Sequence, residues 1–186
     1  MTMFERHTIP SAPEGSRSPM TRLQESAGLV PNLAAMMAGA PALIDGFVTL
    51  RAIYQQASLD VRDREILGLS NAVANGCEWC VAFHSFVALK LGIDRAIVDA
   101  IRDGTPLADP KARALHRFTI RLIEQRGAVA GRDLEDFIQA GFTKQQALEG
   151  VAGCALSLMA NYAGNFVDPD LDGFLGDLRW SAVHRS

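Results

Sequence analysis

Long hydrophobic runs are scarce in this sequence. The longest, Gly150–Ala160, is flanked by Glu149 and Asn161 and falls well short of the ~18 apolar residues that cross a bilayer. Met1–Ser18 is polar and lacks the apolar segment of a secretory signal peptide. We therefore expect a cytoplasmic protein without a membrane partner, with residues 150–160 in a buried core helix.

Clusters of positive charge are also missing. The chain has 18 Lys and Arg against 21 Asp and Glu, a net charge of −3, and no block of basic residues. A nucleic-acid-binding surface needs a basic stripe, and an anionic membrane attracts basic clusters. No nucleic-acid partner is therefore expected. The hydrophobic residues, 48% of the chain, are ample for a buried core.

Only three cysteines are present, which is too few to build a disulfide framework. Cys77 and Cys80 are separated by two residues, and in a cytosolic protein this spacing indicates metal binding or redox chemistry. Cys154 lies among small apolar residues, and we interpret it as a small buried hydrophobic side chain. The chemistry of the protein is therefore expected at Cys77 and Cys80.

Alternating strand patterns are missing as well, and apolar residues recur with a helical period along nearly the whole chain. The sequence predicts an all-α fold of about seven to eight helices. A mobile arm is expected over residues 1–18, followed by a single helical domain over residues 19–186. The predicted helices cover Pro31–Met37, Pro41–Gln56, Val61–Val73, Cys77–Leu91, Asp94–Gly104, Pro110–Gln125, Asp133–Gly141 and Thr143–Asn165.

Small residues recur at spacings of three and four along the last predicted helix, which lets another helix approach closely. We favour internal packing of this side over a subunit interface. The small residues are Gly150, Gly153, Cys154, Ser157 and Ala160. The polar residues that end the helix, Asn161, Tyr162 and Asn165, fit either a capping or a pocket role. His116 has arginines nearby on its helix and is expected in a solvated or interfacial position.

Cys77, Cys80 and His84 share one face of their predicted helix, because each residue turns the helix by about 100°. His84 follows Cys80 by one turn, where side chains meet and a base can take a proton from a thiol. The start of a helix carries unpaired N–H groups that favour a thiolate. Two sulfurs at this spacing can also close a disulfide, so the pair is suited to dithiol–disulfide cycling.

Glu65 joins this group only if the chain folds back on itself. In one unbroken helix it would lie about 18 Å along the axis from Cys77. Asn75-Gly76 is a strong break signal. A turn there can lay Val61–Val73 against the cysteine helix, and we expect Glu65 to orient His84 and stabilise its protonated form.

The order Glu65, Cys77-X-X-Cys80, His84 resembles the AhpD-type alkylhydroperoxidase signature of the carboxymuconolactone decarboxylase superfamily. Leu29–Leu33, followed by Pro41 and Arg64-Glu65, is similar to the peroxidase-related branch. The similarity extends over residues 27–165 in order and helical pattern, and its most specific part is Glu65 to His84.

The resemblance implies an AhpD-like helical bundle, usually trimeric or hexameric, that reduces hydroperoxides without flavin, haem or metal. It implies that Cys80 is the attacking thiolate and Cys77 the resolving thiol, with His84 and Glu65 as the proton relay. An external dithiol, on a lipoylated or thioredoxin-like protein, would then restore the reduced enzyme. The best-studied members have a histidine between the cysteines, where this chain has Trp79.

The two thiols are not equivalent in this scheme. Position at the helix start favours Cys77 as the nucleophile, whereas the spacing to His84 favours Cys80. We expect Cys80 to attack, in agreement with the resemblance. Trp79 is expected to shield the disulfide from water, to recognise a partner, or only to pack against an adjacent subunit.

Three other interpretations fit parts of the pattern. Cys77, Cys80 and His84 could bind zinc, but a structural site needs a fourth ligand, which only Glu65 or Cys154 could supply. A carboxymuconolactone decarboxylase-like acid–base enzyme would not need a dithiol. A non-catalytic stress protein could keep an unused dithiol. A thiol-dependent hydroperoxidase or disulfide reductase explains all four residues.

Overall fold

The structure, a computed structural model, describes residues 3–129 and 131–182. These residues form nine α-helices, one 3-10 helix and no strand, so the predicted all-α fold is confirmed. Residues 1 and 2 of the predicted arm, and residues 130 and 183–186 of the predicted domain, lie outside the described residues. The elements are α1 (Glu14–Ala27), α2 (Asn32–Met37), α3 (Pro41–Tyr54), α4 (Val61–Ala74), α5 (Glu78–Lys90), α6 (Arg95–Asp103), α7 (Pro110–Glu124), α8 (Arg132–Gln139), α9 (Lys144–Val167) and the 3-10 helix η1 (Gly173–Leu178).

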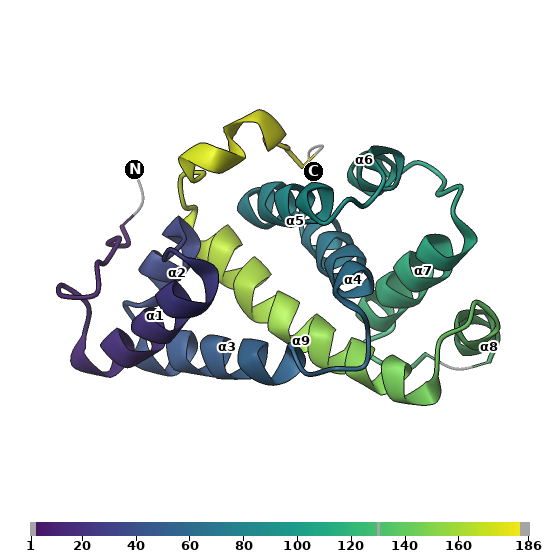
Figure 1. The fold of residues 1–186 in the computed structure, drawn as a ribbon, viewed down its shortest axis with the longest axis horizontal. Helices are drawn as coiled ribbons and strands as arrows, with labels where there is room; N and C mark the ends of the chain where they lie inside the picture. Colours follow the sequence, from purple (N-terminus) through teal and green to yellow (C-terminus); the bar gives the residue numbers. More distant parts are fainter. Residues whose placement is uncertain (1–2, 130, 183–186) are drawn as a thin grey trace.

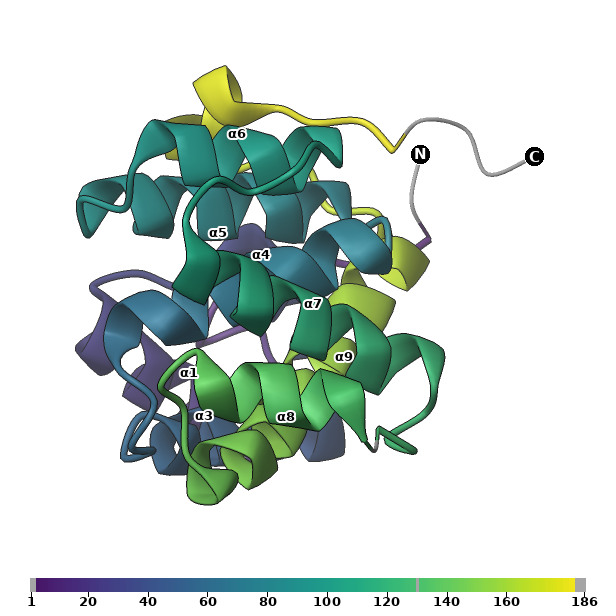
Figure 2. The same ribbon diagram turned by 90° about the vertical axis from the view of Figure 1, so that its right-hand side faces the viewer.

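The long helix α9 runs diagonally through the fold (Figure 1). On one side α3 packs against α1 and α9, and on the other α4 packs against α5, α7 and α9. Figure 2 shows α6 and α5 above α4 and α7, with α8 below them. Helix α4 is therefore the inner helix, and Leu67 and Leu69 on it are buried.

Local sequence signals set the starts of the helices around the cysteines. The Asp60 carboxylate accepts the Asp63 N–H at 2.8 Å and begins α4, as a helix N-cap does. Thr143 and Gln146 form the predicted capping box at the start of α9. Gly76 has φ +64°, so it permits the sharp turn that separates α4 from α5.

The small-residue side of α9 packs inside the protein, as predicted. A Cβ atom added at Gly150 would lie 3.3 Å from Cε1 of Phe118, and one at Gly153 would lie 2.9 Å from Cδ2 of Leu67. The Gly153 atom would also collide with the Tyr54 hydroxyl. The glycines therefore allow α9 to approach α3, α4 and α7 closely.

Helix α1 departs from the predicted arm, because it begins at Glu14 and includes residues 14–18. Ser16 and Met20 are fully buried, and the Ser16 hydroxyl donates to the Ala38 carbonyl at 2.6 Å. Serine and proline are common both in mobile segments and in the first turn of a helix. Packing of α1 on α3, which the local sequence does not reveal, stabilises the helix here.

Residues 168–182, here called the C-terminal strap, follow α9 and place η1 against α5 (Figure 1). The Arg102 guanidinium donates to the carbonyls of Leu178 and Arg179, both at 3.1 Å. The Trp180 indole N–H donates to the Arg102 carbonyl at 3.0 Å. No periodic pattern in the sequence predicts this segment, which tertiary hydrogen bonds hold in place.

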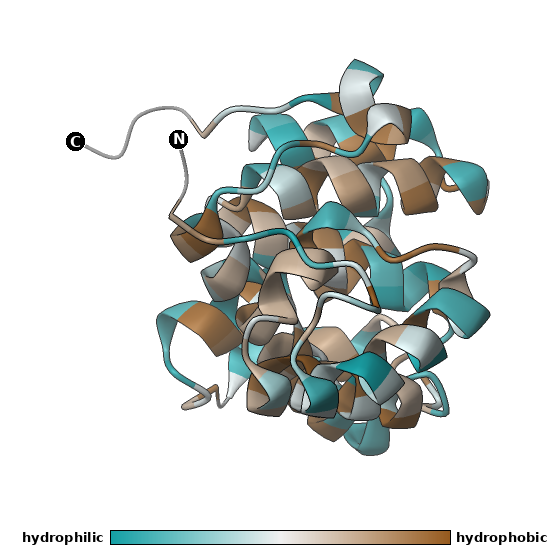
Figure 3. Cartoon of the chain, turned by 90° about the vertical axis from the view of Figure 1, so that its left-hand side faces the viewer, coloured by the Kyte–Doolittle hydropathy of each residue, from teal (hydrophilic) through white to brown (hydrophobic). Residues whose placement is uncertain are grey.

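Hydrophobic and hydrophilic positions alternate along the helices, as expected for amphipathic helices around a core (Figure 3). The buried hydrophobic residues form a core cluster that extends from Ala12 to Leu175. No helix within the described residues is long and apolar enough to cross a bilayer.

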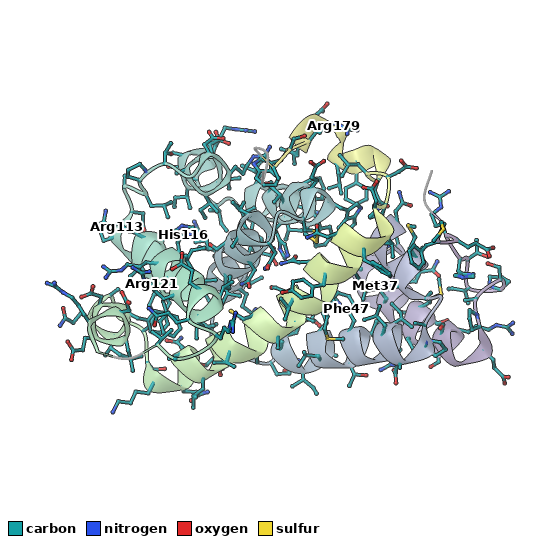
Figure 4. The ribbon with its side chains drawn as sticks, turned by 180° about the vertical axis from the view of Figure 1, so that it is seen from behind. Met37, Phe47, Arg113, His116, Arg121 and Arg179 are labelled. Atoms are coloured by element: carbon teal, nitrogen blue, oxygen red, sulfur yellow. A yellow bond between two sulfur atoms is a disulfide. The ribbon has the colours of Figure 1, made fainter. Side chains whose placement is uncertain are left out.

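His116 on α7 (Figure 4), expected in a solvated or interfacial position, is partly covered by its own chain. It is half-buried, and its Nδ1 atom lies 2.8 Å from the Ser70 hydroxyl oxygen. Because the Ser70 hydroxyl donates to the Ile66 carbonyl at 2.7 Å, we assign the bond as donation from His116 Nδ1–H. Burial lowers the pKa of His116 below its ordinary value of 6.5.

The pH dependence of stability tests the burial of the His116 imidazole. The unfolded chain binds a proton at His116 more readily than the folded protein does, so stability falls as pH drops below about 6.5. We expect His116→Gln, which can still pair with Ser70, to lose less stability between pH 7 and pH 5.5. One proton changes the slope by at most ~1.4 kcal/mol per pH unit. Denaturant titrations of both proteins measure the difference, and parallel curves would contradict it.

Candidate active site

The two cysteines close the first turn of α5. Cys77 is the N-cap of this helix, and its Sγ accepts the Cys80 N–H at 3.3 Å. A disulfide joins Cys77 and Cys80, whose Cα atoms are 5.2 Å apart. The residues are only 1% and 2% exposed. The predicted pairing is therefore present, and any reactant must reach sulfurs that lie beneath the surface.

Gly164 of α9 forms part of the wall around the disulfide. A Cβ atom at this position would lie 2.7 Å from Cys77 Sγ and 3.6 Å from Cys80 Sγ. Only glycine therefore lets the α9 backbone lie this close to the sulfurs. The sequence analysis missed Gly164, although it extends the row of small residues by one further turn beyond Ala160.

The predicted contact between α4 and α5 is present at Glu65 and His84. His84 Nδ1 lies 2.8 Å from Glu65 Oε2, and the two side chains are 21% and 18% exposed. His84 follows Cys80 by one turn of α5. When Nδ1–H donates to the carboxylate, Nε2 remains free to exchange a proton.

Gly68 explains how the imidazole fits against α4. An added Cβ would lie 2.7 Å from Nδ1 and 3.0 Å from Nε2 of His84. Sequence reasoning missed this residue. The available signal is a glycine one turn after Glu65 inside a helix, where glycine costs about 1 kcal/mol relative to alanine.

Trp79 connects the disulfide turn to the C-terminal strap. Its indole stacks on Phe83, with ring centroids 5.1 Å apart, and Nε1–H donates to Asp172 at 3.0 Å. Asp172 also accepts the backbone N–H of Asn32 at the start of α2, at 3.1 Å. Trp79 is thus held within its own chain rather than free on the surface.

A cavity of about 480 Å³ lies beside this turn. Its walls are the first turn of α5, Gly164 and Asn165 of α9, and residues 168–171 and 179–180 of the strap. The Asn165 amide donates to the Asn75 carbonyl at 2.7 Å, so Asn165 both caps the end of α4 and lines the cavity.

Other polar groups are buried along the inner side of α9. Cys154 is half-buried and Asn71 lies 3.6 Å from its sulfur; burial raises the pKa of the Cys154 thiol and keeps it protonated. The Asn161 amide is fully buried and, within the described residues, has no hydrogen-bond partner. No group of three or more His, Cys, Asp and Glu in the described part of the chain is arranged to hold a metal ion.

The structure combines an all-α fold with a Cys-X-X-Cys turn and a glutamate–histidine pair, the arrangement that the AhpD-like resemblance implies. The family model for the carboxymuconolactone decarboxylase family matches residues 41–120, which contain all four of these residues. This part of the chain is therefore similar to the carboxymuconolactone decarboxylase family, and the whole chain has the fold of AhpD-like proteins. No curated protein matches it by sequence.

Solved structures share the fold at low sequence identity. An uncharacterized peroxidase-related protein from Ralstonia eutropha JMP134, with an alkylhydroperoxidase AhpD core, is 20% identical with a TM-score of 0.80 over 94% of each chain. The debrominase Bmp8 is 17% identical, with a TM-score of 0.75 over 94% of this chain and 95% of its own. An uncharacterized peroxidase-related protein from Silicibacter sp. TM1040 is 18% identical, with a TM-score of 0.72 over 88% of each chain.

Gly68→Ala tests whether the absence of a side chain at Gly68 is what allows the His84 imidazole to reach Glu65. We expect the new methyl group to push His84 away from Glu65, because overpacking costs ~1–3 kcal/mol and outweighs the ~1 kcal/mol that alanine gains in a helix. Proton NMR should then lose the His84 Nδ1–H signal, and denaturant unfolding should show lower stability. Gly176→Ala, which meets no neighbouring atom, should change neither. An unchanged Nδ1–H signal in Gly68→Ala would contradict the assignment.

Proposed function

We propose that this protein is a thiol-dependent hydroperoxidase, or a disulfide reductase, that cycles Cys77 and Cys80 between dithiol and disulfide. The observation that carries the proposal is the disulfide in the first turn of α5. It lies one turn before His84, which is hydrogen-bonded to Glu65. The match of residues 41–120 to the carboxymuconolactone decarboxylase family model and the fold shared with peroxidase-related proteins support an enzymatic role.

The oxidative half of the cycle uses Cys80 as the nucleophile. His84, oriented by Glu65, takes the Cys80 proton. The thiolate attacks the distal oxygen of a hydroperoxide, the O–O bond breaks, and the alcohol leaves with a proton. Cys80 is then a sulfenic acid, and the Cys77 thiol displaces water from it to form the disulfide.

The reductive half requires an external dithiol, because the chain contains no other cysteine placed to reduce the pair. Cys154 belongs to the inner side of α9 and carries a thiol with a raised pKa. We propose a lipoylated or thioredoxin-like protein as the donor, with no bound cofactor. A cytoplasmic location suits this cycle, since thiol reductants are abundant there.

One structural relative binds a compound that is not a hydroperoxide. The debrominase Bmp8, as its C82A variant, is in complex with 2,3,4-tribromopyrrole. A cysteine thiolate can attack halogen as well as peroxide oxygen. We propose a hydroperoxide for this chain, and a brominated pyrrole is the comparison substrate that tests the choice.

We also propose that the protein forms a homo-oligomer, a trimer or hexamer by family resemblance, through the outer side of α9. The exposed apolar residues there repeat every three or four positions: Leu148, Val151, Ala155, Leu158, Tyr162 and Phe166. No charged residue occurs from Gly150 to Val167. Such a continuous apolar stripe is typical of a protein interface, and closed symmetry lets copies of one stripe cover each other.

Peroxide titration tests the proposed chemistry. The reduced wild type should lose two thiols for each equivalent of hydroperoxide, and Cys77→Ser should accumulate a sulfenic acid at Cys80. His84→Gln should react ~10²-fold more slowly, because it removes the general base.

Three outcomes would contradict parts of this proposal. Sulfenic acid that forms only in Cys80→Ser would reverse the roles of the cysteines. Thiols that react with the brominated pyrrole but not with peroxide would replace the substrate, and activity that survives iodoacetamide would favour acid–base chemistry.

Light scattering tests the proposed oligomer. Leu158→Glu and Tyr162→Glu should shift the wild-type oligomer toward the monomer, because an oligomer would bury the new charges in an apolar interface. Val61→Glu places the same charge on an exposed apolar residue at the start of α4 and should leave the mass unchanged. A wild type that is monomeric at all concentrations would contradict the proposal.

A further inference from the structure

The cavity beside the disulfide turn has no place in the oxidative chemistry described above. It has a volume of about 480 Å³ and lies between the start of α5, the end of α9 and the C-terminal strap. Two indoles, those of Trp79 and Trp180, contribute to its walls. It is therefore large enough for a small thiol-bearing arm, with flat apolar rings to pack against it.

Cys77 and Cys80 do not line the cavity, but two glycines that adjoin them do. Gly76, which precedes Cys77, and Gly164 both line it, and neither has a side chain to separate the cavity from the sulfurs. The position of a Gly164 Cβ is nearer to Cys77 Sγ (2.7 Å) than to Cys80 Sγ (3.6 Å). Cys77 is therefore the sulfur nearer to this wall.

The C-terminal strap is the cavity wall that follows the last long helix and is held by a few hydrogen bonds. Both cysteines are buried, so an incoming thiol must displace part of a wall. The strap contacts the disulfide turn through the bond from Trp79 Nε1–H to Asp172. We expect opening of that bond to let the strap move away from the disulfide turn, while the contact between Glu65 of α4 and His84 of α5 is kept.

The charge of the cavity walls is mainly negative. Glu78, Asp168 and Asp170 contribute carboxylates, and Arg179, labelled in Figure 4, contributes one guanidinium. Asp172 lies behind Trp79 and adds a further carboxylate nearby. These carboxylates repel an anionic reductant, which therefore enters the cavity less readily than an uncharged one.

We propose that this cavity binds the external dithiol, that it selects donors with no negative charge near their thiols, and that the donor attacks Cys77. This inference rests on the proposed dithiol cycle and adds the site, the charge class and the sulfur attacked. An amide-linked dithiol arm has the required character, whereas the same arm ending in a free carboxylate does not.

The exchange balances in two steps. A donor thiolate forms a bond to Cys77 Sγ, the Cys77–Cys80 bond breaks, and the electron pair leaves on Cys80, which takes a proton from the His84 side. The second donor thiol, once deprotonated, attacks the donor sulfur bound to Cys77. Cys77 leaves as a thiolate and is then protonated, and the donor, oxidised by two electrons, departs as its own disulfide.

In this route Cys80 and then Cys77 leave as thiolates, and each has a neighbouring group that stabilises it. Cys80 lies one turn before His84, which can supply its proton. Cys77 Sγ accepts the Cys80 N–H at 3.3 Å, a bond that favours a thiolate there. Attack on Cys80 would instead require the donor to enter past Cys77 from the Gly164 wall.

Charge selection is tested with two donors that carry the same dithiol. Dihydrolipoamide is uncharged at its end and dihydrolipoate is anionic, so the ratio of their rates isolates charge. We expect the wild-type disulfide to be reduced faster by dihydrolipoamide, about three- to tenfold at low salt, with the ratio falling toward one in 0.5 M NaCl. The double variant Asp168→Asn/Asp170→Asn should bring the ratio of the two rates toward one already at low salt.

Glu25→Gln/Glu135→Gln is the matched control, because it removes two exposed carboxylates from α1 and α8. It should keep the wild-type ratio. An unchanged ratio in the Asp168/Asp170 variant would overturn the cavity assignment while leaving the dithiol cycle intact. A wild-type disulfide that neither donor reduces would instead overturn the proposed function itself.

The sulfur attacked is identified by trapping. The oxidised wild type is mixed with 2-mercaptoethanol, quenched in acid and alkylated, and its peptides are analysed by mass spectrometry. We expect the mercaptoethanol adduct on Cys77 and the alkyl group on Cys80. The reverse pattern, or an equal mixture, would overturn the proposed direction of attack.

Discussion

The close approach of two helix backbones to α5 is the constraint on which the site depends. Gly68 of α4 lies under the His84 ring, and Gly164 of α9 lies against Cys77. A side chain at either position would occupy the space of a reactive group. Both glycines lower the intrinsic stability of their helices, and packing of α4 and α9 into the core offsets that cost. The geometry of the reactive residues is thus set by tertiary packing on two sides.

Local signals predict the part of the site that lies on α4 and α5. Asp60 caps one helix, Gly76 breaks the chain, and Cys77 begins the next helix, so a fold-back that joins Glu65 to His84 follows from short-range chemistry. The observed 2.8 Å contact between these side chains agrees with it. Helical period alone also gives the all-α class, because no segment alternates as a strand does.

Contacts between distant residues are what the sequence does not reveal. Trp79 meets Asp172, Ser16 meets Ala38, and His116 meets Ser70. Each pair joins elements whose relative position depends on the whole core, and no periodicity or cap encodes it. For this reason helix α1, the C-terminal strap and the burial of His116 emerge only from the structure, and Gly164 is recognised only once α9 lies beside the disulfide.

The same packing separates the two sides of the disulfide. Glu65 of α4 contacts His84 one turn after Cys80 on α5, while Gly164 of α9 lies nearer to Cys77 and lines the cavity next to the strap. The competing indications from sequence, helix position for Cys77 and histidine spacing for Cys80, then describe different steps. In the proposed cycle, a base one turn from Cys80 would assist attack on an oxidant, and an N–H bonded to Cys77 Sγ would assist its departure during reduction. The asymmetric surroundings thus suit the two chemically identical thiols to the distinct roles proposed for them.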